Sequence, residues 1–160
     1  MLLRFLLLLL FLSCFTNVSA QERKMWVLIV GISDYKHFNS LQFADDDAIA
    51  YHQILKKTLG KYYSEEQTRV LLNEDATAAS IEYAMRWLLR NTLENDRVFI
   101  YFSGHGGYED LTDFKLGYLH AYDAFNETYS SGGNISMEFL QAFLQSLSRR
   151  NVQTIFVADA

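Results

Sequence analysis

The sequence predicts an α/β fold in which a mainly parallel sheet carries helices on both faces. Short runs that are apolar at nearly every position alternate with segments whose apolar residues recur every three or four positions. The first pattern is typical of strands buried on both faces, and the second is typical of amphipathic helices. Strands and helices that alternate along a chain favour parallel pairing with right-handed crossovers. The 160 residues, half of them apolar, are enough for one such domain.

Residues 1–20 stand apart from this pattern and have the layout of a secretory signal peptide. Arg4 precedes an apolar run from Phe5 to Leu12, and small residues precede a cleavage site after Ala20. The run is too short to cross a membrane as a stable helix, which predicts a secreted or periplasmic protein without a membrane span. A lipoprotein signal with Cys14 as the lipidated residue is the alternative. Because the sequence has no other cysteine, cleavage after Ala20 would leave no thiol for a disulfide or a thiolate metal site.

The folded domain is predicted to cover residues 24–160, and its first strand is Met25–Gly31. A polar and aromatic loop, 33–40, follows this strand. A helix then begins at Ala44 and ends at Gly60. The acidic triplet Asp45-Asp46-Asp47 lies in its first turn, where carboxylates meet the positive end of the helix dipole.

A second strand and a second helix follow at Thr68–Leu72 and after Thr77, the expected N-cap. The apolar face of this helix consists of Ile81, Ala84, Met85, Leu88 and Leu89. Val98–Phe102 is then apolar at every position and is predicted to be a buried strand. The strand breaks at Gly104, which places His105 on the following turn. The chain up to this point therefore predicts a βαβαβ unit.

The remaining part predicts a short extended piece at 116–119, a loop at 121–134 and a third helix from the cap Ser136 to Arg149. Val152–Ala158 is then predicted to be a fourth core strand. A buried strand normally leads into a turn and a helix, so we expect this domain to be incomplete at its carboxyl-terminal end.

Several function classes lack their sequence signals. The net charge is −5 without a clustered basic face, so no nucleic-acid surface is predicted. The sequence has no dinucleotide or phosphate-binding glycine loop, no nucleophile elbow and no histidine spacing typical of zinc. A receiver-like domain that holds Mg²⁺ with the acidic triplet is a weaker alternative, because the triplet starts a helix rather than ending the first strand.

His105 is the strongest candidate for a catalytic group. It follows a buried strand and lies between Gly104 and Gly106, where backbone and substrate can approach closely. A histidine alone cleaves amides poorly and needs a nucleophile to activate. Asp159 follows another predicted strand of the same sheet, so we expect it at the same sheet edge.

Three segments of the sequence resemble the caspase and metacaspase family: Phe99-Ile-Tyr-Phe-Ser-Gly-His-Gly106, Gly117-Tyr-Leu with Asp123-Ala124 after it, and Phe156-Val-Ala-Asp-Ala160. The resemblance covers residues 24–160. It implies a caspase-like three-layer sandwich and a cysteine endopeptidase that uses a Cys-His dyad. In the family the cysteine follows the position of Ala160, so the resemblance implies that this sequence carries the histidine but not the nucleophile.

The resemblance also assigns roles to single residues. His105 matches the histidine that assists the thiol and protonates the leaving amine, and Gly106 matches a donor of the oxyanion hole. Asp159, Asp47 and Ser103 match positions that line the pocket for the substrate residue before the cleaved bond. Acidic residues there resemble metacaspases and imply cleavage after Arg or Lys. Asp45 and Asp46 are interpreted as helix N-terminal charges.

The expected partner is a peptide or protein substrate, with no nucleic acid. No cofactor and no metal ligand are predicted within these residues, although the resemblance to metacaspases leaves dependence on Ca²⁺ open. The alternative function is a catalytically inactive caspase-like domain that serves as a binding or scaffold module. The sequence predicts no oligomeric state.

Overall fold

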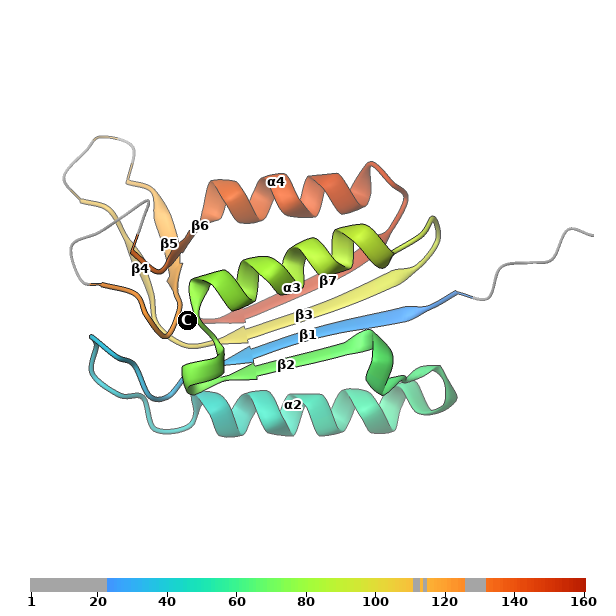
Figure 1. Cartoon of the computed structure of the whole chain (residues 1–160), viewed down its shortest axis with the longest axis horizontal. Coiled ribbons are helices and arrows are strands. Elements are labelled where there is room, and N and C mark those ends of the chain that lie inside the picture. The colour runs from blue at the N-terminus through green and yellow to red at the C-terminus, as the bar shows by residue number, and fades with distance from the viewer. Residues whose placement is uncertain (1–22, 111–112, 114, 126–131) are drawn as a thin grey trace, which may run out of the picture.

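The computed structural model of the chain describes residues 23–110, 113, 115–125 and 132–160 (Figure 1). The predicted signal peptide and Cys14 lie outside these residues. Within them, the elements follow one another as the periodicities of the sequence predict, with additional short strands near the candidate site.

The main sheet has four parallel strands in the order β2-β1-β3-β7. Their bounds are Met25–Gly31 for β1, Thr68–Leu72 for β2, Arg97–Ser103 for β3 and Gln153–Asp159 for β7. All seven residues of β1 are buried, as expected of a central strand covered on both faces. The predicted parallel sheet is therefore confirmed.

Helices cover both faces of this sheet and complete the three layers (Figure 1). Helix α2, Ala44–Leu59, packs over β1 and β3 on one face. Helices α3, Ala78–Asn91, and α4, Met137–Ser148, lie on the other face. Three short 3-10 helices, Gly60–Tyr62, Glu65–Gln67 and Asn73–Asp75, connect these elements. The predicted α/β sandwich is thus confirmed for the described part of the chain.

Both predicted N-caps have the expected geometry. The side chain of Thr77 accepts a hydrogen bond from the backbone N–H of Ser80 at the start of α3. The side chain of Ser136 accepts one from the backbone N–H of Phe139 at the start of α4. Each cap satisfies a backbone donor that has no partner within its helix.

A second, antiparallel sheet lies at the carboxyl end of the main sheet (Figure 1). It consists of β4, Gly106–Tyr108, β5, Gly117–His120, and β6, Asn134–Ser136, in that order. The extended piece expected at 116–119 is β5. The strands β4 and β6 were not predicted, because three residues are too few to show a period of two.

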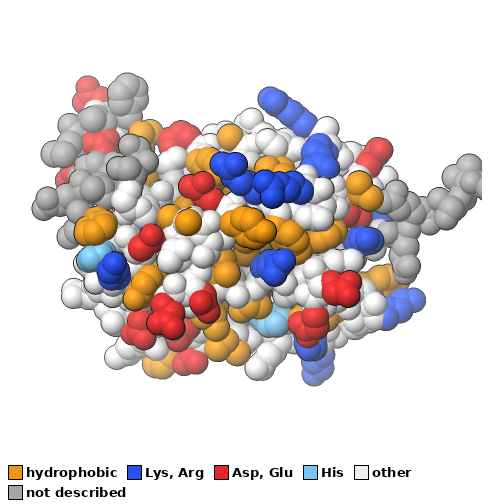
Figure 2. Space-filling model, viewed as in Figure 1, with side chains coloured by type: hydrophobic (Ala, Val, Ile, Leu, Met, Phe, Trp, Pro, Cys, Tyr) orange, Lys and Arg blue, Asp and Glu red, His pale blue; other side chains and the backbone are white. Residues whose placement is uncertain are grey.

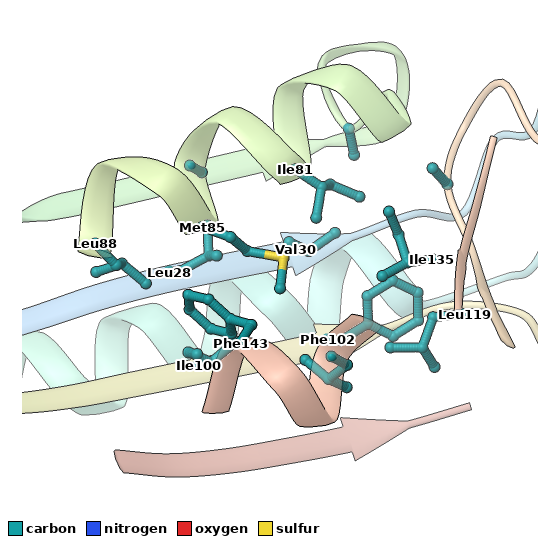
Figure 3. Packing of buried hydrophobic residues seen from close by; sticks show 14 of the residues in the cluster. Leu28, Val30, Ile81, Met85, Leu88, Ile100, Phe102, Leu119, Ile135 and Phe143 are labelled. Atoms are coloured by element: carbon teal, nitrogen blue, oxygen red, sulfur yellow. The ribbon is translucent and has the colours of Figure 1, made fainter. Parts of the chain in front are cut away.

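The main core lies between the sheet and the helices α3 and α4 (Figure 3). Side chains from β1 and β3 meet those of the two helices, and the small sheet closes one end; the labelled members are Leu28, Val30, Ile81, Met85, Leu88, Ile100, Phe102, Leu119, Ile135 and Phe143. Successive side chains of a strand point to opposite faces, so Tyr101 belongs to the second cluster, under α2. The same alternation places Ser103 on the α2 side.

Strand β7 departs from the expectation of a core strand. It lies at the edge of the sheet, and Ile155 and Val157 are 52% and 37% exposed. The reason is that α2 packs over β1 and β3, and no helix of the described residues covers this face of β7. Its other face packs on the main core through Phe156.

Candidate active site

A cleft of about 360 Å³ opens at the carboxyl edge of the main sheet. All five residues that the sequence singles out line it, from four different elements and the turn after β3. The lining residues are Leu41, Gln42, Phe43, Ala44, Asp47, Ser103, Gly104, His105, Gly106, Asp159 and Ala160. The carboxyl edge is where open parallel sheets generally bind ligands.

The register of the parallel strands explains why distant residues meet there. Ser103, the last residue of β3, is aligned with Gly31 of β1 and with Asp159 of β7. The backbone N–H of Gly104 donates to the carbonyl of Asp159 at 3.0 Å, which extends the strand pairing by one residue. Three strands therefore end at the same level, and His105 begins the turn beyond them.

The imidazole of His105 is held by the loop between β1 and α2. Its Nε2 lies 2.8 Å from the backbone carbonyl oxygen of Asn39. A carbonyl oxygen only accepts hydrogen bonds, so this contact assigns the proton of the neutral ring to Nε2 and leaves the lone pair on Nδ1. The rings of Tyr35 and Phe38 flank the imidazole at centroid distances of 4.9 and 6.0 Å. Nδ1 is therefore the atom available to accept a proton.

Tyr35 also fixes the backbone of His105. The backbone N–H of His105 donates to the hydroxyl oxygen of Tyr35 at 2.7 Å. Burial raises the pKa of Tyr35 to about 12, against the opposing effect of the hydrogen bond from His105, so the hydroxyl stays protonated at neutral pH. A Cβ on Gly104 would overlap this hydroxyl, which explains the glycine before the histidine.

Tyr35 was missed in the sequence because its role depends on a contact 70 residues away. The segment 33–40 has no helix or strand period, so the sequence predicts only a polar and aromatic loop there. The available signal was the presence of large aromatic residues in an otherwise polar segment, which indicates packing against the domain rather than solvation.

Asp47 and Asp159 make one end of the cleft acidic. Burial raises the pKa of Tyr101, a hydrogen bond with Ser103 lowers it, and the nearby carboxylates of Asp159 and Asp47 raise it further. Both carboxylates therefore act on the same hydroxyl. Tyr51, one turn after Asp47 on α2, stacks on Tyr101 with ring centroids 4.3 Å apart. The cleft thus has two carboxylates in its lining, next to a stacked tyrosine pair of the core under α2.

The three carboxylates of the acidic triplet at the start of α2 lie in three different environments. The carboxylate of Asp45 accepts hydrogen bonds from the Ser33 hydroxyl at 2.5 Å and from the Asn73 amide at 2.9 Å. These hydrogen bonds hold the pKa of Asp45 below its usual range. Asp46 is exposed, and Asp47 lines the cleft. Asp45 thus does more than interact with the helix dipole.

No metal site is formed by the part of the chain that the structure describes. Within it, no three side chains of His, Cys, Asp or Glu come together in a way that could hold an ion. The separation of Asp45, Asp46 and Asp47 explains why the triplet does not do so. The three carboxylates therefore do not form a common ligand group in the described residues.

His120 lies directly behind the turn that carries His105. Its backbone N–H donates to the carbonyl of His105, and its Nδ1 is 2.5 Å from the side-chain oxygen of Asn134. Burial lowers the pKa of His120; the contact with Asn134 opposes this, and the charge of His105 adds to it. A Cβ on Gly107 would collide with its ring. His120 therefore packs the turn from behind, in keeping with a structural role.

Charge is unevenly distributed on the face shown in Figure 2. Acidic side chains lie near the end of the molecule where α2 begins, and a group of Lys and Arg side chains lies over α3. The acidic end is the one that carries the carboxyl edge of the sheet. Among the described residues, none of the helices has the length and apolar character needed to cross a membrane.

Curated relatives are metacaspases. The chain is 26% identical over 137 residues to Metacaspase-1 of Mycosarcoma maydis, which covers 79% of the chain and 32% of the relative. It is 34% identical over 92 residues to Metacaspase-1 of Saccharomyces cerevisiae, covering 52% of the chain and 21% of the relative. Metacaspase-1B of Aspergillus oryzae is 33% identical over 95 residues, covering 56% and 22%. The chain therefore spans between about a fifth and a third of the length of these relatives.

A solved structure has the same fold. Protein GSU0716 from Geobacter sulfurreducens superimposes with a TM-score of 0.67 over 85% of this chain and 50% of the other, at 19% sequence identity. At that identity the likeness concerns the fold alone. The model of the caspase domain family matches residues 24–160, which include every element of both sheets. The chain belongs to the caspase domain family of cysteine peptidases, peptidase family C14, and its relatives are metacaspases.

Proposed function

We propose that this chain provides the histidine and the substrate pocket of a cysteine endopeptidase that cleaves after Arg or Lys. The observation that carries the proposal is the convergence of His105, Gly106, Ser103, Asp47 and Asp159 on one cleft. These residues come from α2, β3, the turn after β3, the start of β4 and the end of β7. A cleft at a sheet edge that combines a fixed imidazole with an acidic pocket suits peptide hydrolysis beside a basic residue.

The nucleophile of this proposal is a cysteine directly after Ala160 in a longer chain. A Cβ on Gly106 would lie 3.1 Å from the Cβ of Ala160, so the next residue would start beside His105 and Gly106. His105 Nδ1 would take the thiol proton, and the imidazolium would then protonate the amine that leaves. The hydrogen bond from Nε2 to Asn39 would hold the ring during both transfers. The Gly106 N–H would donate to the oxyanion.

The preference for Arg or Lys rests on the charge of the pocket. Asp47 and Asp159 supply two carboxylates, and the described residues that line the cleft include no Lys or Arg. A carboxylate that loses water when substrate binds is stabilised by a cation, and the guanidinium of Arg can bond two oxygens at once. An acidic substrate residue would meet repulsion in the same pocket.

Two further proposals, secretion and dependence on Ca²⁺, rest on separate observations. Secretion rests on the pattern of residues 1–20 alone, and cleavage at Cys14 remains the alternative. Regulation by Ca²⁺ rests on family resemblance, and the described residues supply no ligand set for it.

The catalytic role of His105 is tested in a protein that extends beyond Ala160. We expect His105→Ala to lower kcat/KM for peptides with Arg or Lys before the cleaved bond by about 100-fold or more, the usual contribution of a general acid and base. His37→Gln is the matched control, since His37 stacks on Phe125 and does not line the cleft; it should retain activity within about twofold. Undiminished hydrolysis by His105→Ala would remove the role. Absence of turnover in the unmodified protein would favour a caspase-like binding domain.

A further inference from the structure

Ser33 closes the base of the loop between β1 and α2, where the two ends of the loop meet. We call this part of the loop its neck. The backbone N–H of Leu41 donates to the carbonyl of Ser33 at 2.8 Å, which joins the two ends of the segment 33–41. The Ser33 hydroxyl donates to the carboxylate of Asp45 at 2.5 Å and accepts from the backbone N–H of Asp45 at 3.2 Å. Ser33 is only 6% exposed. The backbone and the hydroxyl of Ser33 thus both form hydrogen bonds that join the two ends of the loop.

Asn73 holds the same neck from the other side. Its side-chain oxygen accepts from the backbone N–H groups of Ser33 and Asp34 at 2.8 and 3.0 Å. Its amide donates to the second carboxylate oxygen of Asp45 at 2.9 Å. The backbone of Asn73 has a φ of 46°, a left-handed conformation that asparagine tolerates better than most residues. We name Ser33, Asp45 and Asn73 the neck cluster.

The segment closed by the neck cluster holds His105. Asn39 supplies the carbonyl that accepts from Nε2 of the imidazole, and Tyr35 supplies the hydroxyl that accepts from its backbone N–H. Leu41, at the neck, is itself a wall of the cleft. A change in the neck therefore displaces the groups that orient the imidazole, although no member of the neck cluster touches it in any contact that the structure shows.

We propose that Asp45 is a positioning residue that fixes the orientation and the tautomer of His105 through the neck cluster. Only the expected effect on turnover rests on the proposed catalytic role of His105. Its structural content, that the carboxylate of Asp45 keeps the Asn39 carbonyl at the imidazole, does not depend on turnover and can be tested on the 160-residue chain.

The need for a carboxylate follows from the direction of the hydrogen bonds. Ser33 and Asn73 each donate to a different oxygen of Asp45, so both oxygens must accept. In Asp45→Asn one position is an NH₂ group, which faces a donor unless the hydroxyl of Ser33 rotates. Asp45→Asn is therefore the conservative variant that retains shape and one acceptor, whereas Asp45→Ala removes both.

The control residue is the next one in the same helical turn. Asp46 is exposed, and its backbone N–H donates to Asp45. Asp46→Ala removes the same charge near the same helix end and leaves the carboxylate of Asp45 in place. An effect of net charge or of the helix dipole would be common to both substitutions, and an effect of the neck cluster would not.

The test is nuclear magnetic resonance of the histidine rings in the 160-residue chain. The ring ¹⁵N shifts report the tautomer, and the exchange rate of the Nε2 proton with water reports the hydrogen bond to Asn39. We expect the neutral His105 ring to be almost entirely in the Nε2–H form in the unmodified chain. In Asp45→Ala the Nε2 proton should exchange at least tenfold faster and the ring should become a mixture of tautomers. Asp45→Asn should lie between them, and Asp46→Ala should match the unmodified chain within twofold.

Ser33→Ala provides an independent variant if Asp45→Ala fails to fold, because it removes one arm of the neck cluster and should change the His105 ring in the same direction. An unchanged His105 ring in Asp45→Ala or in Ser33→Ala would overturn the proposal, as would an equal change in Asp46→Ala. None of these readouts needs turnover. If a longer protein proved inactive as a peptidase, the proposed function would fail while this result would stand.

In an active, longer protein the same inference predicts a specific kinetic change. Asp45→Ala should lower kcat about tenfold and leave KM within about twofold, because Asp47 and Asp159 of the pocket are untouched. A rise in KM at constant kcat would contradict a positioning role and would indicate a role in substrate binding.

Discussion

At the scale of single residues, the site depends on a small set of contacts around one backbone position. The backbone N–H of His105 donates a hydrogen bond to the Tyr35 hydroxyl, and the absence of a side chain at Gly104 leaves room for that hydroxyl. The contact therefore explains the tyrosine at 35 and the glycine at 104. A buried donor without a partner is costly, so this contact stabilises the fold as well as the site.

The contact between Tyr35 and Gly104 is testable by a double-mutant cycle. Tyr35→Phe leaves the N–H of His105 without its acceptor, and we expect it to lower the free energy of unfolding by about 1–3 kcal/mol. Gly104→Ala should also destabilise, because its Cβ overlaps the hydroxyl. The penalty of Gly104→Ala should be smaller in the Tyr35→Phe background, where the overlapping oxygen is gone.

Urea unfolding of the four proteins measures these values. Tyr108→Phe is the control for loss of a hydroxyl, since Tyr108 is 67% exposed and its substitution should change stability little. Strict additivity of Tyr35→Phe and Gly104→Ala would show that the two positions do not interact.

At the scale of elements, periodic segments could be predicted and contact-dependent ones could not. Strand β1 and helix α3 have the expected bounds within about a residue, because a run of buried residues or an amphipathic stripe is visible locally. Strands β4 and β6 are too short for any period, and their pairing with β5 is set by tertiary contacts. The edge position of β7 was also hidden, since apolar composition does not say whether a helix will cover a strand.

The candidate site follows the same division. The positions of His105 and Asp159 at one sheet edge could be predicted, because parallel strands end together. The resemblance supplied Asp47 and Ser103. The acceptors on the loop before α2 could not be predicted, because Tyr35 and Asn39 reach His105 across 70 and 66 positions of the chain.

The junction of loop and helix at Asp45 predicts a dependence of stability on pH. Hydrogen bonds from Ser33 and Asn73 lower the pKa of Asp45 in the folded chain below the ordinary value of about 4. The unfolded chain therefore binds this proton at higher pH. The stabilising contribution is complete above the ordinary pKa and is lost as pH falls through the lowered pKa.

Urea unfolding of the unmodified chain and of Asp45→Asn between pH 2 and pH 7 tests this sign. At neutral pH the unmodified chain should have a higher free energy of unfolding than Asp45→Asn. This difference between the two proteins should shrink as the pH falls into the acid range. Asp46→Asn should show no such narrowing. A difference that stays constant with pH, or that grows on acidification, would contradict the ionised state of Asp45 in the neck cluster.

At the scale of the whole molecule, one end of the main sheet carries the candidate site and the other end carries a buried carboxylate that stabilises the fold. The carboxyl edge carries the cleft, and the amino edge is held by Asp96, which is 1% exposed. The carboxylate of Asp96 accepts from the Trp26 indole N–H at 2.9 Å and from the backbone N–H groups of Lys24 and Leu93 at 3.0 and 2.9 Å. It thereby ties the start of β1 to the turn before β3.

Removal of this carboxylate should affect stability and spare the site. Asp96→Ala leaves three donors without their acceptor, and we expect a loss of about 3 kcal/mol or more in the free energy of unfolding. The ring ¹⁵N shifts of His105 should stay unchanged where the variant is folded. Glu94→Ala is the control, because Glu94 lies in the same turn, is exposed and accepts one hydrogen bond from Asn151. A comparable loss in Glu94→Ala would contradict the role of the buried carboxylate.

We propose that the cleft at the carboxyl edge selects a basic substrate residue through Asp47 and Asp159. The most direct measurement is kcat/KM of a protein extending beyond Ala160 on matched peptides that differ only in having Arg, Lys, Ala or Asp before the cleaved bond. We predict that Arg and Lys exceed Ala and Asp by about 100-fold or more, and that Asp159→Asn and Asp47→Asn each reduce this ratio about tenfold without lowering the rate on Ala. Equal rates on all four peptides, or a ratio that neither substitution changes, would contradict the claim.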